Sequence, residues 1–209
     1  MRITDLGVTD FQTALTRQME RVEEVIQGAE PSLFLVEHPP VITLGRSADW
    51  SNLLLTPEAL EKLGIQLVRI GRGGDITCHY PGQLVAYPIF RLDRRPGGVR
   101  RFFSDLEEVV IRVLAGLGVN GERLEGTAGV FVQGRKIASM GIAVKRWVSF
   151  HGVSLNLKGN RALFSTIVPC GLTGVSMTSL EDELGPLAPK MPELKEHVID
   201  GFTQVFAQT

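Results

Sequence analysis

The sequence predicts an α+β fold, with a mixed or antiparallel sheet covered by helices on one side. Two observations predict it. Strand-like segments dominate the middle of the 209-residue chain, and helical patterns dominate its ends. The regular alternation of strand and helix that a doubly wound parallel fold requires is missing. No internal repeat or linker divides the sequence, so we expect residues 1–209 to form a single domain.

Helical patterns occur in four segments. The first opens with Thr9 and Gln12, which read as a capping box, and apolar residues then recur every three or four positions. The second follows Thr56 and has Pro57 at its first position, where a missing N–H is harmless. We expect helices at about residues 9–28, 57–64, 101–117 and 192–207.

Strand patterns fill the intervening sequence. They are short apolar runs, rich in β-branched residues and bounded by Gly and Pro. Gln133, Gly134 and Arg135 give a hairpin signal between two of these runs. We expect strands at about residues 32–37, 41–44, 66–70, 76–79, 84–90, 129–132, 136–144 and 148–157.

The charge balance argues against a nucleic-acid partner. The chain has 22 basic and 23 acidic residues and a net charge of -1, whereas proteins that neutralise phosphates carry an excess of Lys and Arg. One local basic cluster reads either as a solvated loop or as a docking patch for an acidic partner protein. It consists of Arg91, Arg94, Arg95, Arg100 and Arg101.

The sequence is that expected of a cytoplasmic protein with reduced thiols. Its two cysteines, Cys78 and Cys170, do not suggest a disulfide framework. Residues 1–10 lack an apolar signal segment, and no apolar run approaches the ~20 residues that span a bilayer. We therefore expect no membrane partner, and a monomer.

The densest group of chemically active residues lies between Arg72 and Gln83. Gly73 and Gly74 allow a ligand to approach the backbone closely, while Arg72 adds a fixed charge and His79 a titratable group. The segment lacks the ending of a Walker loop and the glycine spacing of a dinucleotide fingerprint. It therefore predicts a ligand-binding loop of another kind.

Two further positions could carry chemistry. Cys170 lies between Pro169 and Gly171, on a tight turn where a nucleophile could be exposed, although a free cysteine is more often a buried structural residue. Lys136 opens an apolar strand, where a lysine is usually exposed. If it lay in a pocket instead, its ammonium group would lower the pKa of a nearby thiol. No Cys or His spacing indicates a metal site.

These segments, in this order, resemble the octanoyl-[acyl-carrier-protein]–protein N-octanoyltransferases of lipoate biosynthesis, the lipoyl(octanoyl) transferases. The resemblance spans nearly the whole chain. It rests on Arg72-Gly73-Gly74-Asp75-x-Thr77-x-His79-x-Pro81-Gly82-Gln83, Gly129-Val130-x-Val132, Lys136-Ile137-Ala138-Ser139-x-Gly141, Phe150-His151-Gly152 with Leu155-Asn156, and Pro169-Cys170-Gly171-x-x-Gly174.

The resemblance implies a fold like the catalytic domain of biotin and lipoate protein ligases. It implies that Cys170 forms an acyl-thioester and that Lys136 lowers its pKa and relays protons, with the N–H of Gly171 as an oxyanion donor. It also implies that the acyl site is lined by Arg72, Gly73, Gly74, Asp75, Ile76, Thr77, Cys78, His79, Ser139, Met140, Gly141, Gly152, Val153 and Ser154.

In this interpretation the donor is octanoyl-acyl carrier protein, whose phosphopantetheine carries the acyl group, and the enzyme needs no cofactor or metal of its own. The acceptors are lysines on the lipoyl domains of 2-oxoacid dehydrogenase complexes and on the glycine cleavage H protein. Three alternatives stay open: an ATP-dependent lipoate or biotin ligase, an amidotransferase that moves octanoyl between lipoyl domains, and a non-catalytic acyl- or protein-binding module.

Overall fold

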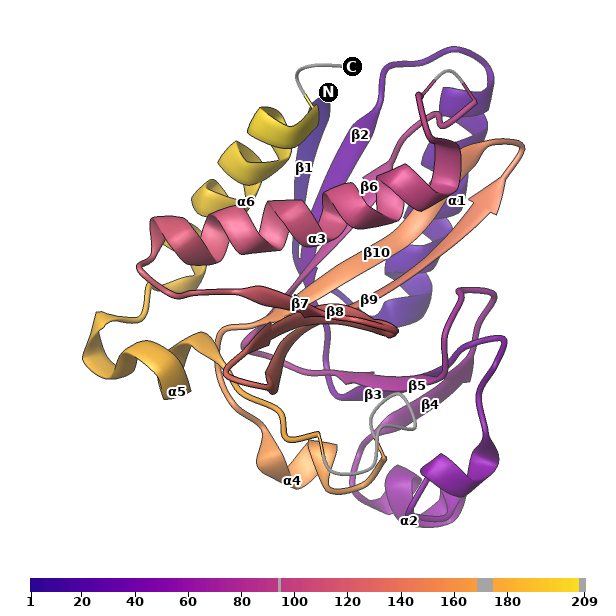
Figure 1. Cartoon of the computed structure of the whole chain (residues 1–209). Coiled ribbons are helices and arrows are strands. Elements are labelled where there is room, and N and C mark those ends of the chain that lie inside the picture. Colours follow the sequence, from indigo (N-terminus) through magenta and orange to yellow (C-terminus); the bar gives the residue numbers. More distant parts are fainter. Residues whose placement is uncertain (94, 169–174, 207–209) are drawn as a thin grey trace.

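A seven-stranded mixed sheet forms the centre of the molecule (Figure 1). The computed structural model describes residues 1–93, 95–168 and 175–206. The sheet has the order β1-β2-β6-β10-β9-β8-β7, in which β1 and β2 are parallel and the other neighbours antiparallel. Its strands are β1 (Arg2–Val8), β2 (Ser32–Glu37), β6 (Gln83–Ile89), β7 (Glu122–Leu124), β8 (Thr127–Val132), β9 (Arg135–Lys145) and β10 (Val148–Asn156).

A second, three-stranded sheet lies below the first in Figure 1. Its order is β4-β3-β5, with β3 parallel to β4 and antiparallel to β5. Its strands are β3 (Val41–Leu44), β4 (Gln66–Arg69) and β5 (Ile76–His79). Two short helices and a 3-10 turn flank it: η1 (Trp50–Asn52), α2 (Pro57–Lys62) and α4 (Arg161–Phe164). The expected mixed α+β fold is confirmed.

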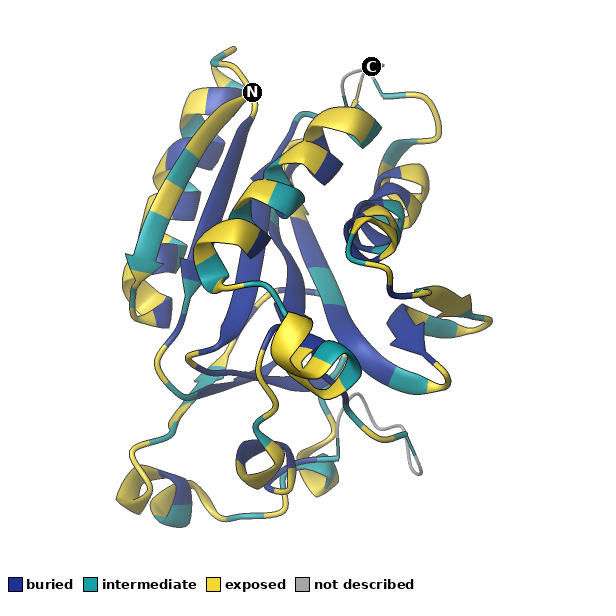
Figure 2. Cartoon of the chain, turned by 90° about the vertical axis from the view of Figure 1, so that its left-hand side faces the viewer, coloured by how far each residue is buried: buried dark blue, intermediate teal, exposed yellow. Residues whose placement is uncertain are grey.

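Helices cover both faces of the large sheet, which corrects the prediction of helices on one side. Along β2, Leu33 and Leu35 face the cluster under α3 (Gly98–Gly116) and α6 (Met191–Phe206), whereas Phe34 and Val36 face α1 (Phe11–Ile26). Because both faces of this strand are apolar, both must be covered. Figure 2 shows the central strands largely buried, the edge strand β1 exposed, and the long helices exposed on their outer sides.

The first helix begins one residue later than the capping box implied. Asp10, not Thr9, is its N-cap, and the Asp10 carboxylate accepts the N–H of Thr13 at 2.9 Å. The Thr9 hydroxyl instead donates to the carbonyl of Leu6. Asp is as good an N-cap as Thr or better, so the neighbour with the better geometry takes the position. The cap fixes the position of Phe11, the first residue of α1.

Several short elements were not expected from the sequence. They are β1, η1, β7, α4, α5 (Leu180–Leu184) and η3 (Gly185–Leu187). Each is three to seven residues long, too short for a periodic pattern to stand out. Among the described residues, no helix is long and apolar enough to cross a membrane.

Candidate active site

A cavity of about 300 Å³ lies between the two sheets and the beginning of α1. One end opens to solvent at Ser47, Gly126 and Ala128, which are exposed. The other end is closed by Phe11 and Tyr87, each only 2% exposed. The volume lies at the lower end of the range of small-molecule sites, which fits a short ligand that enters at this rim and extends inward.

Most of the predicted acyl-site residues line this cavity. They are Arg72, Gly74, Asp75, Thr77, His79, Ser139, Met140, Gly141, Gly152, Val153 and Ser154. Three others do not. Ile76 and Cys78 point into the apolar cluster between the small sheet and α4, because alternate residues of a strand face opposite sides. Gly73 donates its N–H to the carbonyl of Ile142 and so pins the loop to β9.

Arg72 is a rigid part of the cavity wall. Its guanidinium donates to the carbonyl and hydroxyl of Thr43 at 2.8 and 2.9 Å and to the carbonyl of Gly73 at 3.1 Å. A Cβ on Gly141 would lie 2.9 Å from Cδ of Arg72, so only glycine lets this side chain pass. The arrangement places one fixed positive charge beside an otherwise largely apolar space.

A chain of buried hydrogen bonds leads from the cavity to the backbone at Thr178. His79 Nδ1 is 2.6 Å from Gln83 Oε1, Gln83 Nε2 donates to Asn156 Oδ1, and Asn156 Nδ2 donates to the carbonyl of Thr178. A carbonyl can only accept, so every donor in the chain is fixed. His79 therefore carries its proton on Nδ1 and has an unprotonated Nε2.

The imidazoles around the cavity are held neutral. Burial lowers the pKa of His79 to about 3, assisted by repulsion from His38. Burial, together with the charge of Arg72, lowers the pKa of His151 to about 3. His38 donates from Nδ1 to the carbonyl of Thr9 and accepts at Nε2 from the hydroxyl of Tyr87, at 2.7 and 2.8 Å. At neutral pH these rings are hydrogen-bonding and packing groups without charge.

Lys136 is buried rather than exposed, with 1% of its surface accessible. Its backbone N–H donates to the carbonyl of Ser176, and its carbonyl accepts the N–H of Thr178. Its ammonium lies 5.7 Å from the ring centroid of Phe131. A Cβ on Gly129 would lie 2.7 Å from Cε of Lys136, so the side chain runs directly past Gly129. Ala128 at the cavity rim precedes that glycine, although Lys136 itself does not line the cavity.

Asp75 connects the cavity lining, through Asn52, to the chain at Val168. One carboxylate oxygen accepts the N–H of Asp49 at 3.0 Å, and the other accepts the side-chain amide of Asn52 at 2.5 Å. The carbonyl of Asn52 in turn accepts the N–H of Val168 at 2.8 Å. Cys170 and Gly171 lie outside the described residues, but the chain on both sides of them is hydrogen-bonded near the rim, to Asn52 before and to Lys136 after.

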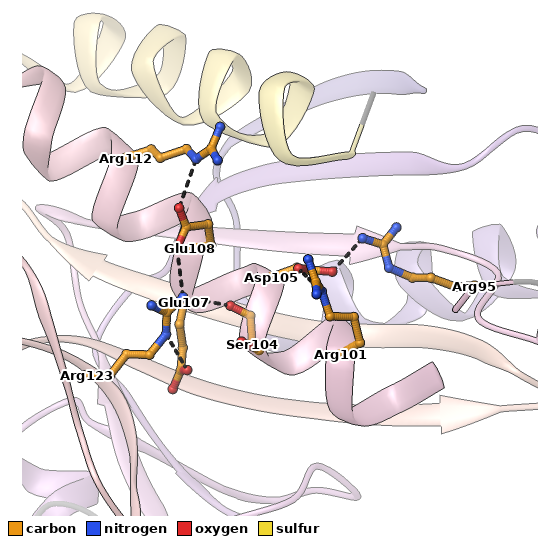
Figure 3. A network of polar contacts seen from close by, with 8 residues as sticks. All are labelled: Arg95, Arg101, Ser104, Asp105, Glu107, Glu108, Arg112 and Arg123. Carbon is orange, nitrogen blue, oxygen red and sulfur yellow. Dashed lines mark hydrogen bonds and ion pairs between the residues drawn. The ribbon is translucent and has the colours of Figure 1, made fainter. Parts of the chain in front are cut away.

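The basic cluster is largely engaged within the molecule. Arg95 and Arg101 both pair with the buried Asp105 of α3, and Arg91 pairs with Asp93 (Figure 3 shows the contacts of Arg95 and Arg101). Farther along α3, Glu108 pairs with Arg112 of the same helix and with Arg123 of β7. Arg94 lies outside the described residues. Arg91, Arg95 and Arg101 are thus held in ion pairs within the molecule, whereas Arg100 is exposed on α3.

Sequence reasoning did not single out several lining residues. Phe11 read as a helix core residue and Tyr87 as a strand residue, and both are brought to the cavity only by tertiary packing. His151 was noted in the Phe-His-Gly motif without a role. No group of three or more His, Cys, Asp or Glu side chains among the described residues could hold a metal ion.

Comparison with known proteins shows what the chain is similar to. The model of the lipoyl protein ligase A/B catalytic domain matches residues 10–203. An octanoyltransferase of Nitratidesulfovibrio vulgaris is 50% identical over 100% of this chain and 96% of its own length. The bi-partite lipoate protein ligase of Thermoplasma acidophilum superimposes with a TM-score of 0.78 at 18% identity, over 99% of this chain and 83% of that chain. The biotin protein ligase of Aquifex aeolicus does so with a TM-score of 0.57 at 12% identity, over 99% and 71%.

Proposed function

Because the chain belongs to the lipoyl protein ligase A/B catalytic-domain family and to its octanoyltransferases, we propose that it transfers an octanoyl group onto lysines of lipoyl domains. The donor in this proposal is octanoyl-acyl carrier protein, and the group passes through a thioester on Cys170. The full-length similarity to an octanoyltransferase supports the choice of acyl group. We also propose that residues 1–209 act as one catalytic domain.

The observation that carries the proposal is the placement of Lys136. A lysine side chain is almost never fully buried unless its charge is paired. Lys136 is only 1% exposed and lies beside the cavity rim. Its backbone pairs with Ser176 and Thr178, six and eight positions after Cys170 in the sequence. A Cys/Lys pair at the rim would put the reacting carbonyl there and the acyl chain in the cavity.

The proposed reaction has two transfers. Lys136 takes the proton of Cys170, the resulting thiolate attacks the thioester carbonyl, and the N–H of Gly171 helps to hold the oxyanion. The carbon–sulfur bond to phosphopantetheine then breaks, and its sulfur leaves as a thiol with the proton that Lys136 held. The ε-amine of the acceptor lysine then attacks the acyl-enzyme, and Lys136 relays the proton that the amine loses to the departing Cys170 sulfur. An amide is more stable than a thioester, so the overall transfer needs no ATP.

The cavity suits a short acyl chain. Phe11, Ile70, Val85, Met140 and Val153 supply apolar surface, and the neutral imidazoles add none of the charge that would have to be desolvated. Lipoyl domains of 2-oxoacid dehydrogenase complexes and the glycine cleavage H protein are the proposed acceptors.

Intact-protein mass spectrometry tests the proposal. The protein is mixed with octanoyl-acyl carrier protein without ATP, and we expect one hydroxylamine-labile octanoyl adduct that maps to Cys170. Cys170→Ser should form no labile adduct and lose transfer to a lipoyl domain. Cys78→Ala is the matched control and should keep the adduct, because Cys78 packs away from the cavity.

A second reaction mixture, with free octanoate and ATP, distinguishes the alternatives. Octanoylation of a lipoyl domain only under these conditions, with no acyl-enzyme, would replace the proposal with an ATP-dependent ligase, because a ligase passes the acyl group from an acyl-adenylate to the lysine. A folded protein that forms no acyl-enzyme and octanoylates no lipoyl domain in either mixture would instead be an acyl- or protein-binding module.

A further inference from the structure

The closed end of the cavity is a fixed aromatic floor. Phe11 begins α1, where the Asp10 cap sets its position, and its ring is 2% exposed. The ring stacks on His79 and His151, with centroids 6.3 Å away in both cases and planes 9° and 12° from parallel. The ring of His38 packs on a third side of Phe11, with the two ring centroids 5.4 Å apart. Rings packed in this way cannot give space to a ligand without a loss of contacts.

The orientation of a bound acyl chain follows from the rim, and this step rests on the proposed function. Lys136 passes Gly129 next to the rim, and Asp75 connects the rim through Asn52 to Val168. The thioester carbonyl would therefore lie at the rim, and the methyl end of the chain would point inward toward Phe11.

Besides the imidazoles, Phe11 packs against apolar side chains. The ring packs with Val41 and with Ile70, which also lines the cavity, and Leu15 and Val68 adjoin the same cluster between α1 and the small sheet. Removal of the ring would therefore extend the cavity into apolar space. Tyr87, the other floor residue, could not be shortened so simply, because its hydroxyl donates to His38.

We infer that Phe11 sets the upper limit of acyl chain length. Methylene groups in excess of this depth would have to displace a packed ring or push the carbonyl outward past the rim. Each methylene that a deeper cavity buries is worth about 0.8 kcal/mol, which corresponds to about a fourfold gain in relative reactivity. The discrimination between chain lengths should therefore move with the size of residue 11.

Competition between thioesters tests the inference. Wild-type protein and the variants Phe11→Ala, Phe11→Leu and Phe11→Trp are mixed with equal amounts of hexanoyl-, octanoyl-, decanoyl- and dodecanoyl-acyl carrier protein, and the acyl-enzymes are counted by mass. Phe11→Ala should raise the ratio of decanoyl to octanoyl adduct at least about tenfold, for two methylenes. Phe11→Leu should raise it less, and Phe11→Trp should favour hexanoyl.

Val22→Ala is the matched control. Val22 is buried in the same helix and lies away from the cavity, so its loss should lower stability without altering the ratio. An unchanged ratio in folded Phe11 variants that still form adducts would overturn the inference. If Phe11→Ala does not fold, the opposite shifts expected of the Leu and Trp variants decide it. Absence of any adduct from the wild-type protein would count against the proposed function instead.

Discussion

At the scale of single residues, the cavity depends on backbone conformations that most side chains avoid. His151 has a φ of 58° inside β10, and its N–H, turned out of the sheet ladder, donates to Gln18 Oε1 of α1 at 2.8 Å. A non-glycine residue in this region costs about 1–3 kcal/mol unless its surroundings hold it. The fully buried Gln18 supplies that restraint, and as a result the imidazole of His151 lines the cavity.

Gly129 is the residue whose substitution should most directly disturb Lys136. Its φ is 129°, and an added Cβ would lie 2.6 Å from the carbonyl oxygen of Ala138 and 2.7 Å from Cε of Lys136. We expect Gly129→Ala to lower the free energy of unfolding by about 1–3 kcal/mol and to slow formation of the acyl-enzyme. Thermal unfolding and the rate of adduct formation measure the two effects.

Gly134→Ala separates backbone strain from displacement of Lys136. Gly134 has a φ of 75° in the turn between β8 and β9, and no described atom lies within 4 Å of a Cβ built there. This variant should lose stability but keep the rate of the wild-type protein. If both variants slow the reaction equally, the contact between Gly129 and Lys136 has no special part in it.

The sequence motifs located the binding segment but did not show which of its residues face the cavity and which face the core. Residues 72–79 were predicted as one continuous binding segment. In the structure, Thr77 and His79 line the cavity, whereas Ile76 and Cys78 pack in the core. A strand period of two would have made this division, because 76–79 had been predicted as a strand. Phe11 could not be found in this way, since only the packing of α1 against the small sheet brings it there.

At the scale of elements, Asp75 connects β5 to η1 and through it to the chain before Cys170. In Asp75→Asn one carboxylate oxygen becomes an amide donor, and it would then face the N–H of Asp49 or the amide of Asn52. A hydrogen bond to a charged group is worth about 1.5–3 kcal/mol, so we expect acyl-enzyme formation to slow by about tenfold or more. Single-turnover mass spectrometry with octanoyl-acyl carrier protein measures the rate.

The thermal midpoint of Asp75→Asn should fall as well, because the same hydrogen bonds contribute to stability, so the rate is measured well below that midpoint. Asp93→Asn is the matched control, since Asp93 pairs with Arg91 on the connection between β6 and α3. A wild-type rate in Asp75→Asn would show that the link from Asp75 through Asn52 does not position the reacting residues.

The longer elements followed from the sequence, and their arrangement in space did not. The segments 32–37, 41–44 and 76–79 were predicted with the boundaries observed, because each is a short apolar run between turn residues. The sequence did not reveal that β3, β4 and β5 leave the main sheet, which depends on pairing between distant segments. The nearly continuous apolar runs of β2 and β6, which the structure buries, were the signal in the sequence that helices cover both faces.

At the scale of the whole molecule, a buried network of polar side chains connects the cavity to the backbone at Thr178. Gln83 and Asn156 are 1% and 2% exposed, and together they link His79 to the backbone beside Lys136. Such a network favours one arrangement of its elements when every member is paired. The same burial keeps His79 and His151 neutral far below their ordinary titration range.

These histidines should make the folded state less stable in acid. An unfolded histidine binds a proton below a pKa of about 6.5, whereas His79 and His151 in the folded protein do so only near a pKa of about 3. The unfolded state therefore binds more protons between these values, and the free energy of unfolding falls as the pH drops from 6.5 toward 3.

Urea unfolding at pH 7, 6 and 5 measures the slope of the free energy of unfolding against pH. His151→Asn should reduce it by about one proton, because Asn tolerates a positive φ and does not titrate in this range. His197→Asn, outside the cavity, is the matched control for the loss of a histidine. A slope that His151→Asn leaves as steep as in the wild-type protein would mean that His151 is not the buried neutral group assigned to the cavity wall.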